Sequence, residues 1–213
     1  MKKMWFAIAV LGLSLTAAAQ SEKFTGAMQK NLAQFDSAKT VEDFNRVANT
    51  FERIGDAEKS QWLPYYYAGL SLSMSGWMNE VGDKDAHAAR ILVFCDKAEA
   101  VAASDADRAE IMVLRNMAAT QQMMVDPATR WATYGQSAGQ AIEKGMKLDP
   151  SNPRLYYLRG MSVFNTPVQF GGGKDKAKPV LEKAVELFKQ ENPRPLYPHW
   201  GKAQAEQQLA QCQ

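Results

Sequence analysis

The sequence predicts an all-α protein, an antiparallel helix-pair solenoid of about nine helices. A helical pattern containing tyrosine and glycine recurs along the chain, with Gly69, Asn116, Gly160 and Gly201 at its aligned positions. Successive copies are 47, 44 and 41 residues apart, and self-similarity at such a period indicates stacked helical units rather than one closed core. No segment shows a sustained alternation of apolar and polar residues, so the sequence predicts no strands.

The first 20 residues predict a cleaved secretory signal peptide. Lys2 and Lys3 precede an apolar run at residues 4–15, and small residues follow before Gln20. This order is typical of a signal that is cut near Gln20, although a retained anchor or a core helix is the alternative. There is no cysteine at the cleavage region that could carry a lipid. We therefore expect a periplasmic or secreted protein whose mature chain has no integral membrane segment.

The charge of the mature chain argues against nucleic acid as a partner. The full chain has 25 Lys+Arg and 23 Asp+Glu, and the two surplus lysines lie in the predicted signal peptide. The mature chain is then formally neutral, without the basic balance typical of nucleic-acid-binding domains. Its length is sufficient for one short solenoid.

Residues 21–55 predict an N-terminal capping helix pair. The first helix carries an apolar stripe at helical spacing, formed by Phe24, Met28, Leu32 and Phe35. Thr40, followed by Asp43, resembles a capping box that opens the second helix. Gly55 is a residue of the type that commonly ends a helix, so we expect the second helix to end there.

Residues 56–213 predict degenerate helical repeats separated by proline-containing breaks. Pro150 and Pro153 interrupt one helical pattern, and Pro193 and Pro195 interrupt the next. Proline is well tolerated in the first turn of a helix, which places helix starts at Pro153 and Pro195. We expect helices at Trp62–Met78, Asp85–Ala103, Asp105–Val125, Pro127–Leu148, Pro153–Asn165, Lys174–Gln190 and Pro195–Gln211.

The middle of this region resembles the tetratricopeptide repeat family. Residues 141–150 resemble the end of the family's second helix, and Tyr156-Tyr157-Leu158-Arg159-Gly160 resembles the opening of its first. The family has small residues where its paired helices touch. Ala138, Ile142 and Gly145 are small, large and small at that spacing, and Ala177, Leu181 and Ala184 repeat the order. The resemblance implies an exported bacterial protein with degenerate repeats. The period exceeds the family's 34 residues, and Asn116 replaces the expected small residue.

In that family the first helix of each pair lines a concave groove, and the resemblance implies which residues face it here. The predicted partner-binding residues are Tyr66, Leu70, Glu110, Val113, Met117, Arg154, Tyr157, Met161 and Phe164. We expect an exported scaffold that holds a protein or peptide in this groove. Apolar burial would supply the affinity, and Arg154 and Glu110 would fix the orientation of the partner.

The glycine-rich segment Phe170–Lys174 favours a second function. Three successive glycines before a helix could present backbone N–H groups to a phosphate, with Lys174 adding a positive charge. The alternative is a sharp turn between helices, because the segment lacks the spacing of a P-loop. The preceding residues resemble a loop of exported helical-repeat proteins, including those associated with TRAP transporters. The second hypothesis is therefore a small-molecule binding accessory component of a transporter.

Catalytic and metal-binding motifs are missing from the sequence. His87 and His199 have no partner at metal-ligand spacing, and neither a Cys-x-x-Cys nor a Gly-x-Ser-x-Gly motif occurs. We expect no enzyme, no cofactor and no metal, with His87 at an exposed helix position. Cys95 is expected in the core and Cys212 in a mobile tail. The two belong to opposite ends of a solenoid, which disfavours a disulfide between them.

Overall fold

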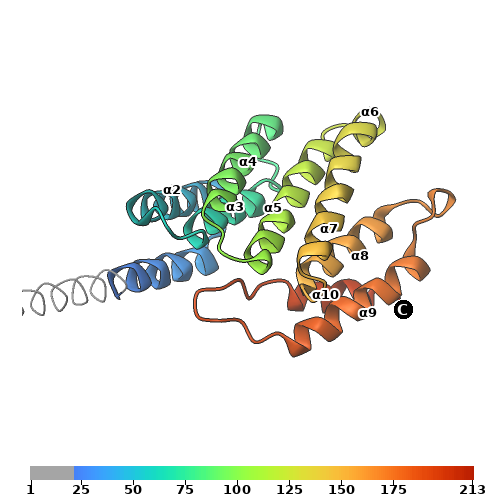
Figure 1. Ribbon diagram of the computed structural model, residues 1–213. Coiled ribbons are helices and arrows are strands. Elements are labelled where there is room, and N and C mark those ends of the chain that lie inside the picture. Colours follow the sequence, from blue (N-terminus) through green and yellow to red (C-terminus); the bar gives the residue numbers. More distant parts are fainter. Residues whose placement is uncertain (1–21) are drawn as a thin grey trace, which may run out of the picture.

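The computed structural model describes residues 22–213, and every regular element in that range is helical (Figure 1). When α6, η1 and α7 are counted as one continuous helix, the described range contains nine helices. The predicted all-α class is confirmed. The predicted signal peptide, residues 1–20, lies outside the described residues.

The first helix spans residues 22–37. The other elements, in order, are α2 (Val41–Glu58), α3 (Leu63–Ser75), α4 (Lys84–Ala100), α5 (Asp105–Met124), α6 (Pro127–Arg130), the π-helical η1 (Trp131–Gly135), α7 (Gln136–Leu148), α8 (Pro153–Asn165), the 3₁₀ turn η2 (Val168–Phe170), α9 (Lys174–Gln190) and α10 (Lys202–Ala210).

Helices that follow one another along the chain pack together, as in a solenoid. The largest contacts join α2 to α3, α5 to α7 and α8 to α9, whereas the contact between α7 and α8 is much smaller. In addition, α5 contacts both α3 and α8. The helices α3, α5 and α8 therefore lie beside one another along one face, which we call the concave face (Figure 1).

Two capping boxes fix the starts of helices. Thr40 and Asp43 bond reciprocally at the start of α2, as predicted, and Ser104 and Asp107 do the same at α5. The predicted end of α2 at Gly55 is wrong, because the helix continues to Glu58. Gly55 instead allows close packing: a Cβ at this position would lie 2.7 Å from Cε1 of Tyr65.

The last predicted helix, Pro195–Gln211, is also wrong in its first part. Residues 191–201 form no helix, and α10 begins only at Lys202. Leu196 has a φ of 68°, outside the right-handed helical region. Pro198 lacks the backbone donor that a helix would need there. We call residues 191–201 the C-terminal crossing segment.

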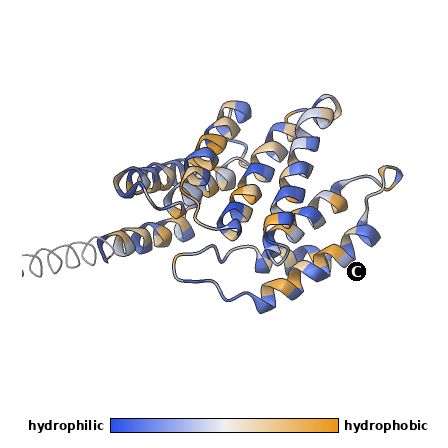
Figure 2. Cartoon of the chain, viewed as in Figure 1, coloured by the Kyte–Doolittle hydropathy of each residue, from blue (hydrophilic) through white to orange (hydrophobic). Residues whose placement is uncertain are grey.

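The apolar core is divided unequally. One large cluster is formed by the first helix and α2–α5, and Leu155 of α8 joins it. Two small clusters lie under α9 and α10. Each helix mixes apolar and polar positions, as expected of helices that bury one side (Figure 2). The C-terminal helices therefore depend more on polar contacts for their attachment to the rest.

The two cysteines lie in separate clusters. Cys95 is in the large cluster, as predicted, but Cys212 is buried in a small cluster with Ala177 and Leu181 rather than in a mobile tail. His87 also differs from its prediction, because it is buried and its Nε2 lies 2.7 Å from the carbonyl oxygen of Leu72. The last turn of the chain thus belongs to the folded structure.

Candidate functional site

The structure places the predicted partner-binding residues on α3, α5 and α8, but it buries most of them. Six are buried: Tyr66, Leu70, Glu110, Val113, Met117 and Arg154. The other three, Tyr157, Met161 and Phe164, are half-buried. The six buried residues offer no open surface to a partner in this conformation, and their role in binding stays a prediction.

A buried ionic cluster joins α3, α5, α8 and the C-terminal crossing segment at the concave face. Arg154 donates from Nε to Oε1 of Glu110 at 2.8 Å and also pairs with Glu191. Asn152 and Tyr66 donate to the two oxygens of Glu110, at 2.6 and 3.0 Å. The side chains of Arg154 and Glu110 are only 4% and 7% exposed. The polar atoms of these residues satisfy one another, as buried charges require.

The electrostatics of the cluster keep its hydrogen-bond directions fixed. Burial, and then the charge of Glu110, raises the pKa of the Tyr66 phenol well above its usual value. Burial acts to lower the pKa of Arg154, but Glu110, Tyr66 and Glu191 outweigh it, and the pKa is raised overall. Tyr66 therefore stays protonated as a donor, and Arg154 stays charged.

The C-terminal crossing segment covers the concave face. Trp200 donates from Nε1 to the hydroxyl of Tyr66 at 2.9 Å, and Tyr197 donates to Asp107 at 3.1 Å. Arg154 donates to the carbonyl oxygen of Trp200 at 3.2 Å. The segment runs from the end of α9 toward α3 and returns to α10 (Figure 1). Sequence reasoning missed this cover, although three prolines in residues 193–198 argued against a helix there.

A cleft of about 370 Å³ lies beside the cluster. Its walls come from α5, the turn before α8, the end of α9 and the C-terminal crossing segment. Its charged residues are Glu110, Asp149, Arg154, Glu191 and Arg194. Arg154 is already bonded to Glu110 and Glu191. Leu187, Tyr197 and three prolines supply apolar parts of the wall.

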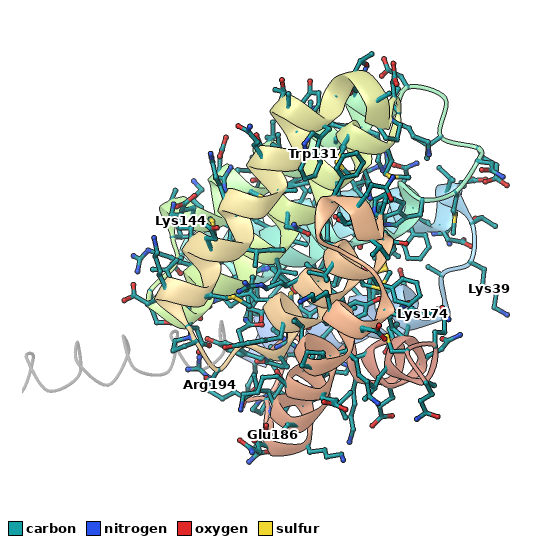
Figure 3. The ribbon with its side chains drawn as sticks, turned by 90° about the vertical axis from the view of Figure 1, so that its right-hand side faces the viewer. Lys39, Trp131, Lys144, Lys174, Glu186 and Arg194 are labelled. Atoms are coloured by element: carbon teal, nitrogen blue, oxygen red, sulfur yellow. The ribbon has the colours of Figure 1, made fainter. Side chains whose placement is uncertain are left out.

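Two groups of exposed apolar side chains lie elsewhere, one in η1 and one around η2. Trp131 in η1 is 56% exposed, and Val168 and Phe170 in η2 are 77% and 76% exposed. Phe164, half-buried near the end of α8, leads into the same turn. The labelled Trp131 and Lys174, the residue that begins α9, lie on the same side of the molecule (Figure 3). We call Trp131, Phe164, Val168 and Phe170 the apolar end surface.

The glycines before α9 form a hydrogen-bonded turn rather than a phosphate cradle. The N–H groups of Gly171, Gly172 and Gly173 donate to the carbonyl oxygens of Val168, Pro167 and Val163, respectively. Gly171 and Gly173 have φ values of 86° and 101°, which favour glycine. A Cβ on Gly172 would lie 2.1 Å from a backbone oxygen of Thr166. The glycines thus hold the tight turn that carries Val168 and Phe170.

Trp131 lies at the start of an irregular helical turn. The π-helical turn η1 interrupts the helix between α6 and α7, and such turns are frequent at functional sites. A Cβ on Gly135 would lie 2.4 Å from the ring of Trp131, so the indole lies over a glycine. Sequence reasoning missed Trp131. A tryptophan four residues before a glycine in a helix is the signal that could have indicated it.

Across residues 22–213 there is no group of three or more His, Cys, Asp or Glu side chains that could hold a metal ion. In the same range no helix is both long and apolar enough to cross a membrane. His199 is exposed on the C-terminal crossing segment.

No protein-family model matches this chain, and no curated protein matches it either. A solved structure, the HusA haemophore from Porphyromonas gingivalis, is similar to it. The two share 34% sequence identity with a TM-score of 0.77, over 89% of this chain and 92% of the haemophore. The helical repeat-like architecture agrees with this similarity, whereas assignment to the tetratricopeptide family stays a prediction.

Proposed function

Because this chain belongs to the family of the HusA haemophore, we propose that it is an exported protein that binds haem as cargo and does not catalyse a reaction. The identity of 34% over nearly the whole of both chains is the observation that carries the proposal. It favours the small-molecule hypothesis over the peptide scaffold. This similarity gives no support to the idea that the chain is an accessory component of a transporter.

The apolar end surface has the chemistry that a haem ligand needs. Haem is a flat, largely apolar ring with two carboxylates, and small-molecule sites are mostly apolar with a few polar groups. Trp131 and Phe170 offer aromatic rings, which bury a large area on contact. Large side chains left this exposed favour a ligand that covers them. Binding would remove this apolar area from water, at about 25 cal/mol per Å².

The concave face is the less suitable place for this cargo. Its aromatic residue Tyr66 is bonded to Trp200 of the C-terminal crossing segment, and its charges are paired. Haem that contacted Tyr66 would have to displace Trp200 of the C-terminal crossing segment. The apolar end surface needs no such rearrangement.

Side chains that can ligate haem iron are few near the apolar end surface. Haem iron in proteins is held by His, Cys, Met or Tyr side chains. His87 is buried and its Nε2 is engaged by the carbonyl oxygen of Leu72. Tyr134 in η1 and Tyr156, Tyr157 and Met161 in α8 are the residues of these types on the elements that carry the surface. These four are the candidates for contact with the iron, and Met161 lies one helical turn before Phe164 in α8.

A haem titration of the mature chain tests the proposal. We expect saturable binding, followed by Soret absorbance and by quenching of tryptophan fluorescence. Trp131→Ala and Phe170→Ala should each weaken binding by about 1–2 kcal/mol, or roughly five- to thirtyfold, because each removes a large contact area. Val93→Ala, at a position 53% exposed on α4, is the control and should leave the affinity unchanged.

Two results would count against the proposal in different ways. Failure of the wild-type chain to bind haem would overturn the function. Normal binding by both Trp131→Ala and Phe170→Ala would keep the function and move the site elsewhere.

Export makes a separate prediction. The protein isolated from the native cell envelope or medium should begin near Gln20, because the preceding residues have the order of a cleavable signal. N-terminal sequencing together with cell fractionation measures this. Exported protein that retains Trp5, or protein found solely in the cytoplasm, would contradict it.

A further inference from the structure

Lys174 combines a free charge with the edge of the apolar end surface. It is the first residue of α9 and directly follows the glycine turn that carries Val168 and Phe170. Its Nζ lies 6.0 Å from the centroid of the Phe164 ring. A lysine in this position lays its methylene chain along apolar surface and keeps its ammonium group in water. Lys174 therefore places a positive charge beside the aromatic rings.

The charge of Lys174 has no carboxylate partner among the ion pairs of residues 22–213. Arg130, which directly precedes Trp131, is different because it pairs with Asp85 at 2.7 Å. Around Lys174 the first turn of α9 also holds Asp175, Lys176 and, one turn later, Lys178. The balance of these charges is positive, so the turn favours an anionic group.

We propose that Lys174 pairs with a carboxylate of the ligand bound on the apolar end surface, so that the site selects porphyrins with free carboxylates over their neutral esters. This inference rests on the proposed function. The aromatic residues recognise the ring, and Lys174 recognises the acidic edge. A flat apolar ligand that covers Phe164 and Phe170 also excludes water from one side of the pair, which strengthens the attraction.

The test compares haem with haem dimethyl ester, which has the same ring and iron but no free carboxylate. The wild-type chain should bind haem more tightly than the ester. Lys174→Gln should weaken haem binding about three- to tenfold and leave ester binding unchanged, because only the charge pair is lost. Lys174→Arg should keep most of the preference for haem. Wild-type haem affinity should fall as salt concentration rises, and that fall should be smaller in Lys174→Gln.

Lys189→Gln is the matched control. Lys189 is an exposed lysine in the last turn of the same helix, and 15 residues of helix separate it from Lys174 by about 22 Å. The same change of charge at that position should not affect either ligand.

The possible results separate the inference from the function. Equal wild-type affinity for haem and its ester would overturn the role of the carboxylates. Haem binding by Lys174→Gln that matches wild type, or that is weakened to the same degree for both ligands, would overturn the role of Lys174. In each of these cases haem binding itself persists. A wild-type chain that binds neither ligand would instead overturn the proposed function, and the inference with it.

Discussion

Arg154→Met is expected to lower the free energy of unfolding by about 3–5 kcal/mol, the usual cost of removing one partner from a buried ion pair. Arg154 is bonded to Glu110 and Glu191, and its side chain is 4% exposed. Methionine fills much of the same space but leaves the carboxylate of Glu110 buried without its counter-charge. It also removes the donor to the carbonyl oxygen of Trp200. Urea denaturation at neutral pH measures the change.

Arg159→Met provides the matched control on the same helix. Arg159 is exposed and donates only to the sulfur of Met146, at 3.6 Å. Its replacement should change the free energy of unfolding by no more than about 0.5 kcal/mol. Equal unfolding curves for the two variants would show that the cluster around Arg154 adds no net stability. Adding Glu110→Gln to Arg154→Met should recover part of the loss, because the uncompensated charge is then removed.

Local signals in the sequence predicted most of the helices. The capping box at Thr40 and the proline at Pro153 each act within one helical turn, and each starts a helix where expected. The errors occur where distant contacts decide the outcome. Gly55 does not end α2, which continues to Glu58, and instead leaves room for the ring of Tyr65. The segment after Pro195 crosses the concave face instead of forming a helix.

The candidate site shows the same division between local and distant information. The repeat register placed Tyr66, Glu110 and Arg154 on one face, and the structure brings these three together. It could not indicate that Trp200, 134 residues from Tyr66, covers them. Phe170 was noted as part of a glycine segment, yet its exposure depends on the turn geometry. The sequence therefore indicated the faces of helices better than their accessibility.

Gly160→Leu is expected to destabilise the protein by about 1–3 kcal/mol through overpacking between α8 and α9. A Cβ on Gly160 would lie 2.5 Å from Cδ2 and 2.6 Å from Cγ of Leu181. Leu181 is itself fully buried, in a cluster with Ala177 and Cys212, and has little room to move away. Leucine favours a helix over glycine by about 1 kcal/mol, which offsets only part of the clash. Thermal and urea denaturation measure the loss.

Gly139→Leu is the control with the opposite expected sign. Gly139 also lies inside a helix, α7, but it is exposed, and a Cβ there would meet no atom within 4 Å. The change should therefore leave stability unaltered or raise it by up to about 1 kcal/mol, because only the helix preference acts. A melting temperature of Gly160→Leu equal to that of wild type would show that α8 and α9 do not approach at this glycine. The repeat register that aligned Gly160 with Gly69 would then be wrong as well.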